Sequence, residues 1–170
     1  MSSARRQQVD QDQGVPTLID WMGGPERMEE LIERFYRVVV EDDLLEPLFA
    51  EMDPQHFRYV AMFIAEVFGG PRSYTEVRGG HASMIRKHVG RNISEAQRQR
   101  WLHLLLATAD EVGVPSDPEF RSALVAYLEW GSRLAVINSR PGAEPEEDLP
   151  MPTWGWGEVG GPYVEGSDTA

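Results

Sequence analysis

The amino-acid sequence predicts an all-α protein, on three observations. Apolar residues recur at helical spacing: His56, Val60, Phe63 and Val67 fall at i, i+4, i+7 and i+11 and therefore share one helical face. No segment shows a convincing apolar–polar alternation of period two, the pattern of a half-buried strand. The apolar stretches are separated by Gly pairs and Asp-Pro steps, which typically end one helix and begin the next.

The first half of the chain predicts four helical segments. Gly23 and Gly24 end the first, and Pro25 suits the first position of the second, where a backbone N–H is not needed. Asp53 and Pro54 begin the fourth, and a Gly-Gly-Pro sequence ends it. The expected ranges are 17–22, 25–40, 42–49 and 54–68.

The second half predicts a looser, Gly-interrupted segment over residues 74–88 and then two long helices. Ser94 and Gln97 have the spacing of a capping box, in which each side chain accepts a backbone N–H of the other residue. Asp117 and Pro118 have the pattern of an N-cap followed by a first-turn proline. We expect these helices to reach about residues 112 and 138.

Composition divides the chain into three parts: a disordered polar arm over residues 1–14, a folded domain over 15–138 and a flexible extension over 139–170. The extension is rich in Pro, Gly and acidic residues, which oppose packing into a core. It also contains Trp154, Trp156 and Tyr163. These aromatic residues either dock onto the domain or bind a partner, and the sequence leaves both alternatives open.

The 170-residue chain carries a formal net charge of -12, which makes nucleic acid and anionic membrane surfaces poor candidate partners. It contains no cysteine, which excludes disulfides, thiolate catalysis and cysteine-ligated metals. No apolar run approaches the roughly 20 residues of a membrane span. The first residues form no apolar signal core, so a cytoplasmic protein is expected.

The histidines are the candidate metal ligands. His103 is expected on the surface, two residues past the buried face marked by Trp101, and His81 in a surface or local capping role. His88 lies among Arg86, Lys87 and Arg91, and no HExxH or carboxylate–histidine cluster indicates zinc. A single imidazole with flanking cations suits haem, whose iron takes one histidine and whose propionates attract basic residues. Taken alone, His88 is better explained as an ordinary histidine.

Several segments, in order, resemble the group II truncated haemoglobins. They are the Gly23–Gly24 pair, ERFYRVV, LEPLF, HFRYVAMFIAEVFGGPRSYTE, GGH followed by His88, QRQRWLHLL and EWGSRLAVINS. Together they cover residues 16–138. The resemblance implies a two-over-two helical sandwich around haem b.

The resemblance also implies roles for individual residues near the cofactor. His88 is the expected proximal iron ligand. Phe49 and Phe63 match aromatic residues that contact the haem. Arg78 and Arg91 are candidate partners of the propionates, although a solvated surface position explains them as well.

Three polar-tipped residues, Tyr36, His56 and Trp101, match the distal positions of the family, and Val60 completes the apolar wall between them. Each of the three side chains carries a hydrogen-bond donor that stabilises a diatomic ligand with partial negative charge. His56 is also a candidate gate, or an iron ligand in the absence of a bound diatomic molecule. Taken singly, Tyr36, His56 and Trp101 are each better explained as ordinary core or boundary residues.

The expected function is reversible binding of oxygen and other diatomic ligands, with slow oxygen release. The alternative is redox catalysis, as a peroxidase or in nitric oxide detoxification, supported by an external reductase. A haem-free helical interaction domain is a third interpretation. We expect a monomer or homodimer.

Overall fold

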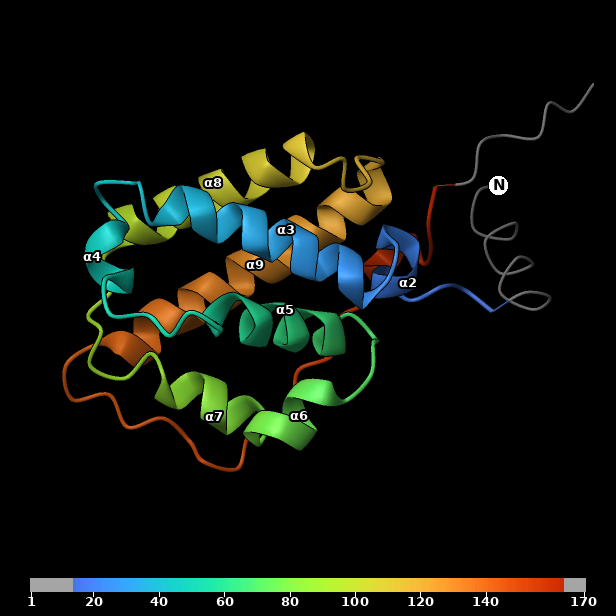
Figure 1. Ribbon diagram of the computed structural model, residues 1–170. Coiled ribbons are helices and arrows are strands. Elements are labelled where there is room, and N and C mark those ends of the chain that lie inside the picture. The colour runs from blue at the N-terminus through green and yellow to red at the C-terminus, as the bar shows by residue number, and fades with distance from the viewer. Residues whose placement is uncertain (1–13, 164–170) are drawn as a thin grey trace, which may run out of the picture.

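The computed structural model describes residues 14–163, which contain helices and connecting segments and no strand (Figure 1). The all-α prediction is confirmed. The expected N-terminal arm falls, apart from Gly14, outside the described residues. The elements are α2 (Leu18–Met22), α3 (Pro25–Val39), α4 (Glu46–Phe49), α5 (His56–Val67), α6 (Ser73–Arg78), α7 (His81–Arg86), α8 (Glu95–Glu111), α9 (Pro118–Ser139) and the 3-10 turn η1 (Gly157–Val159).

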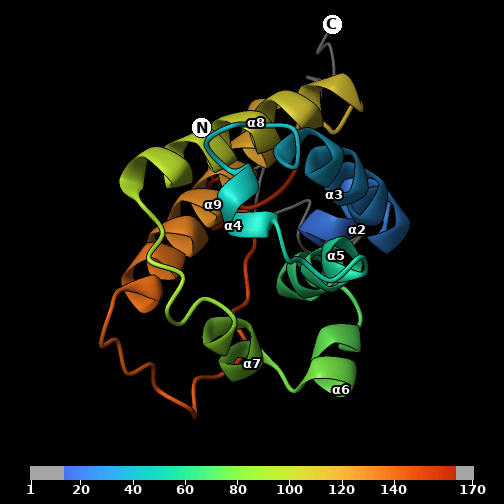
Figure 2. The ribbon, with the colours of Figure 1, turned by 60° about the vertical axis from the view of Figure 1, so that its left-hand side comes forward.

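Four helices form the body of the molecule as two layers of two, α3 with α5 and α8 with α9 (Figure 2). Helix α3 packs along α5 and also crosses to α8, which joins the layers. The largest fully buried side chains of the core are aromatic, and among them Phe35, Phe68 and Phe120 have no exposed surface. This arrangement is the expected two-over-two sandwich.

Local capping explains where the helices begin and end. The Thr17 side chain accepts the Asp20 N–H, and Gly23 closes α2 in the left-handed conformation at φ 114°. The predicted capping box at the start of α8 is present, with Ser94 and Gln97 bonded reciprocally. Asp117 caps α9 by accepting the Phe120 N–H at 3.0 Å.

Three boundaries differ from the sequence prediction. Helix α4 is only four residues long. A turn precedes it, because the Asp42 carboxylate accepts the backbone N–H groups of Leu44 and Leu45. Asp53 makes a similar turn before α5, which therefore begins at His56. The loose segment is two short helices, α6 and α7, separated by Gly79 and Gly80 at φ 90° and 85°.

Where the sequence predicts a flexible C-terminal extension, the structure shows defined contacts over residues 140–163. The Trp154 N–H donates to the Val67 carbonyl at 2.9 Å, and the Trp156 indole N–H donates to the Pro16 carbonyl at 2.8 Å. Tyr163, by contrast, is 51% exposed. Two of the three aromatic residues therefore dock onto the domain, because each partly buries a ring and pairs a backbone or indole N–H.

Candidate functional site

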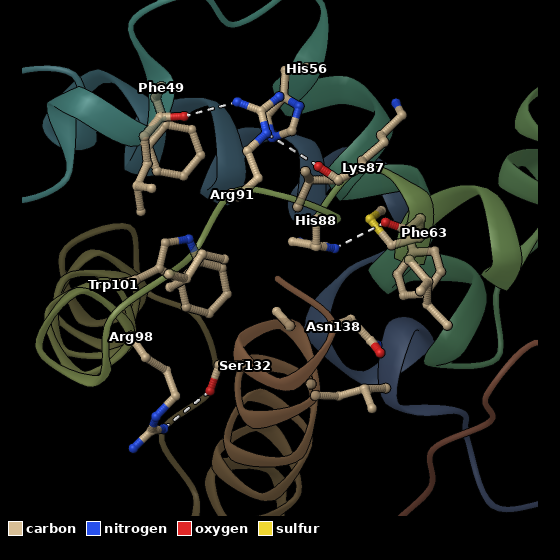
Figure 3. A pocket seen from close by; sticks show the side chains of 18 of the residues that line it. Phe49, His56, Phe63, Lys87, His88, Arg91, Arg98, Trp101, Ser132 and Asn138 are labelled. Atoms are coloured by element: carbon tan, nitrogen blue, oxygen red, sulfur yellow. Dashed lines mark hydrogen bonds between the residues drawn. The ribbon is translucent and has the colours of Figure 1, made fainter. Parts of the chain in front are cut away.

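A cavity of about 460 Å³ opens between the two helix layers and α7 (Figure 3). Its volume is in the range of about 300–1,000 Å³ that is usual for cofactor sites. The residues of the predicted site that line it are Tyr36, Phe49, His56, Val60, Phe63, His88, Arg91 and Trp101. Arg78 is not among the lining residues, since its guanidinium lies over the Tyr59 ring, 4.0 Å from the ring centroid. Eight of the nine predicted residues thus meet in one cavity.

Three separate helices bring the polar-tipped residues together at one side of this cavity. Tyr36 comes from α3, His56 begins α5 and Trp101 lies on α8. The Tyr36 hydroxyl and His56 Nε2 share a hydrogen bond of 3.3 Å, with the donor set by the imidazole tautomer. Phe49 packs edge-on against the Tyr36 ring at 5.4 Å and fixes its direction. The result is a small polar cluster in an apolar wall.

Burial keeps this polar cluster uncharged at neutral pH. Desolvation lowers the pKa of His56 to about 4, helped by the positive charge of Lys87. Desolvation also raises the pKa of Tyr36 well above its usual value, and a hydrogen bond with Trp101 offsets only part of that effect. A neutral imidazole and a neutral phenol each retain a donor and an acceptor.

His88 faces the cavity from the turn that follows α7 (Figure 3). Its Nδ1 lies 3.0 Å from the Met84 carbonyl oxygen. A carbonyl only accepts, so Nδ1 carries the proton and Nε2 is left as a lone-pair donor. This is the usual arrangement of a metal-binding histidine, in which the second nitrogen orients the ring. Burial lowers the pKa of His88 and favours this neutral form.

These features fit a haem. The described residues contain no group of three or more His, Asp or Glu side chains that could hold a bare metal ion, so a single imidazole suits an iron whose other ligands come from a porphyrin. Lys87 and Arg91 supply positive charge at the rim for two carboxylates. Arg98 also lines the cavity, but ion pairs with Glu95 and Glu129 already neutralise its charge.

The sequence profile of the bacterial-like globins matches residues 17–130. The chain belongs to this globin family, as a group II truncated haemoglobin. A curated relative, the group 2 truncated haemoglobin YjbI of Bacillus subtilis, is 30% identical over 113 residues, which is 66% of this chain and 83% of the relative.

Solved structures agree with the family assignment. The thermostable haemoglobin of Thermobifida fusca is 30% identical, with a TM-score of 0.63 over 71% of this chain and 97% of that chain. The truncated oxygen-avid haemoglobin of Bacillus subtilis is 28% identical, with a TM-score of 0.63 over 71% and 99%. This globin accordingly takes haem b as its cofactor and binds oxygen.

The end of the cavity between α7 and α9 contains residues of this globin that the sequence did not indicate. His81 is only 8% exposed and lies between Phe63 and Trp130, at centroid distances of 6.0 and 6.4 Å. The expected surface or capping role of His81 is therefore wrong, because α7 turns the ring inward. Trp130 and Tyr127 complete this aromatic end. No local signal indicated this position, since His88 lies in the turn beyond α7 and a helical spacing does not relate the two histidines.

No described helix of this globin is both long and apolar enough to cross a bilayer. His103 is exposed, as predicted from its position relative to Trp101.

Proposed function

We propose that this globin holds haem through His88, binds oxygen and other diatomic ligands on the side of Tyr36, His56 and Trp101, and releases oxygen slowly. The observation that carries the proposal is the convergence of these three donors, from three helices, in the same cavity as His88. The B. subtilis relative is described as oxygen-avid, which supports the same direction of effect.

The roles of the residues follow from their chemistry. The bound haem supplies an iron centre for reversible coordination of a diatomic molecule. His88 presents Nε2, while the Met84 carbonyl holds the ring orientation. On the other side the phenol, imidazole and indole offer N–H and O–H donors in a water-poor pocket, where each hydrogen bond contributes about 1–3 kcal/mol. If such a hydrogen bond must break before the ligand leaves, each 1.4 kcal/mol of its free energy slows ligand dissociation about tenfold.

The test is haem binding and its rescue. Purified protein should show a Soret absorbance band that shifts on addition of oxygen or carbon monoxide. His88→Gly should weaken haem binding, and added imidazole should restore the native spectrum by filling the vacated space. His103→Gly is the matched control, because His103 is exposed and lies outside the cavity lining. An unchanged spectrum in His88→Gly would refute the assignment of His88.

Peroxide turnover is the second candidate function. The observation behind it is the position of His56, whose neutral imidazole lines the cavity and carries an acceptor nitrogen for the proton of a hydroperoxide. The comparison that decides is the rate of peroxide consumption by the holoprotein against free haem. Equal rates, together with no reductase-supported consumption of nitric oxide, would leave ligand binding as the function.

Three finer expectations remain proposals: a cytoplasmic location, reduction by an external reductase, and a monomeric or homodimeric state. The acidic composition and the absence of cysteine support the first. Reduction of the ferric protein by cell extract fractions, and sedimentation of the purified holoprotein, test the other two.

A further inference from the structure

Helix α7, which leads into His88, has few neighbours among the helices. The extensive helix pairs are α3 with α5, α3 with α8, α5 with α6, α8 with α9 and α2 with α3, and none includes α7. One side of α7 lines the cavity through His81, Met84 and Ile85. Other parts of the molecule must therefore fix the position of α7 and of the candidate iron ligand that follows it.

The segment over residues 140–163, here called the C-terminal strap, lies against the other side of α7. It leaves the end of α9, passes outside α7 and returns toward α2 (Figures 1 and 2). A groove lined jointly by α7 residues and residues 143–147 shows that the two segments are adjacent. Burial lowers the pKa of His81, and the nearby Pro150 carbonyl of the strap offsets part of that effect.

The strap is anchored at its far end by two tryptophans. The Trp154 ring packs on Tyr127 and Trp130, at centroid distances of 5.6 and 5.7 Å. The Trp156 ring packs edge-on against Trp21 and Phe120, at 6.1 and 6.4 Å. Each tryptophan also donates one hydrogen bond to a carbonyl of the domain. Together with its covalent joint to α9, these contacts close the strap around α7.

The strap does not line the haem cavity itself but contacts residues that do. Tyr127, Trp130 and His81 line the cavity, and Trp154 and Pro150 lie behind them. No described residue beyond Asn138 is part of the lining. The strap also begins beyond the part of the chain matched by the family profile, which ends at Trp130.

We propose that the C-terminal strap clamps α7 over the haem and so retains the cofactor, with Trp154 as the positioning residue that locks the clamp. Loss of haem requires His88 to separate from the iron, and because His88 directly follows α7, an outward movement of α7 favours that separation. A strap anchored beyond α7 opposes that movement. The strap does not line the part of the cavity beside Lys87 and Arg91, so it should not affect the entry of a diatomic ligand there. The proposal rests on the assignment of His88 as the iron ligand.

The test compares full-length holoproteins that differ in the strap. Trp154→Ala removes the anchor, and Trp154→Phe keeps an aromatic ring. Insertion of roughly six Gly/Ser residues between Ala143 and Glu144 slackens the strap while leaving both tryptophans in place. The matched control is the same insertion between Pro115 and Ser116, in the α8–α9 connection. Haem loss is measured by transfer to excess apomyoglobin, and the iron–histidine stretching band by resonance Raman spectroscopy.

We expect Trp154→Ala and the strap insertion to speed haem loss about tenfold and to shift the iron–histidine band, as loss of a packed aromatic anchor implies. Trp154→Phe and the control insertion should stay near the native rate. If Trp154→Ala does not fold, the strap insertion still tests the proposal, because it keeps both tryptophans. Native rates and an unshifted band in the strap insertion would overturn the clamp. If His88→Gly also kept the native spectrum, the haem ligand assignment itself would fail.

Discussion

At the scale of single residues, the Tyr36 hydroxyl is the distal group whose removal should be most visible. It is buried, bonds His56 and is approached by Trp101, so it holds the polar cluster together. Tyr36→Phe removes one donor worth about 1–3 kcal/mol and should raise the oxygen dissociation rate about tenfold or more. Stopped-flow displacement of oxygen by carbon monoxide measures this rate. Tyr59→Phe, outside the cavity lining, is the control, and an unchanged rate in Tyr36→Phe would contradict the proposed role.

The pKa of His56 predicts how stability depends on pH. Its folded-state pKa is lowered to about 4 from an ordinary 6.5, so between these values the unfolded chain binds the extra proton more readily. Stability should therefore fall as pH drops from 6.5 towards 4 and stay level above 6.5, as far as this group is concerned. At pH 5 the free energy of unfolding should be about 2 kcal/mol lower than at neutral pH because of His56.

Urea unfolding of the native protein and His56→Gln at pH 7.5 and pH 5 measures this difference. The variant should lose less stability on acidification, while the contribution of His88 is common to both proteins. Equal losses would show that His56 has an ordinary pKa.

At the scale of elements, the end of α5 depends on a close approach of two backbone segments. A Cβ on Gly70 would lie 2.7 Å from the Ala65 carbonyl oxygen, which accepts the Gly70 N–H at 2.8 Å. Gly70→Ala must therefore displace backbone, and we expect a loss of about 1–3 kcal/mol in the free energy of unfolding. Gly155→Ala, where a Cβ would meet no atom within 4 Å, should be near neutral. Similar unfolding midpoints for the two variants would contradict this account.

Helix boundaries were predictable where their causes are local. The capping box of Ser94 and Gln97, the Asp117 cap and the Gly23 end of α2 are set within four residues of sequence. The division of residues 74–88 into two short helices was not predicted, because weak periodicity over six residues does not distinguish a helix from a turn.

At the scale of the whole molecule, the cofactor should stabilise its surroundings unevenly. The layers α3–α5 and α8–α9 pack on each other directly, whereas α7 borders the cavity and has few helix neighbours. Removal of haem should raise hydrogen exchange in α7 roughly tenfold or more and change α3 and α8 much less. Hydrogen-exchange mass spectrometry of the holo- and apoproteins measures this, and a uniform increase along the chain would contradict it.

The candidate site was predicted from sequence to different extents in its two parts. Tyr36, His56, Trp101 and His88 came from the resemblance to a family, since each residue alone is compatible with an ordinary core. The aromatic end of the cavity was not predicted. His81 follows a Gly pair, and a glycine-flanked histidine is as common on the surface, so only the direction of α7 turns it inward.

The sequence by itself determined the helical class, most helix ends and the cluster of basic residues around His88. These follow from periodicity, capping and charge, which act over a few residues. The tertiary structure decided that donors from three helices meet in the same cavity as His88, that Arg78 stacks on Tyr59 away from the cavity, and that Trp154 packs behind the cavity wall. Such contacts depend on how helices cross, and helix crossing is set by the packing of the whole core rather than by any local pattern.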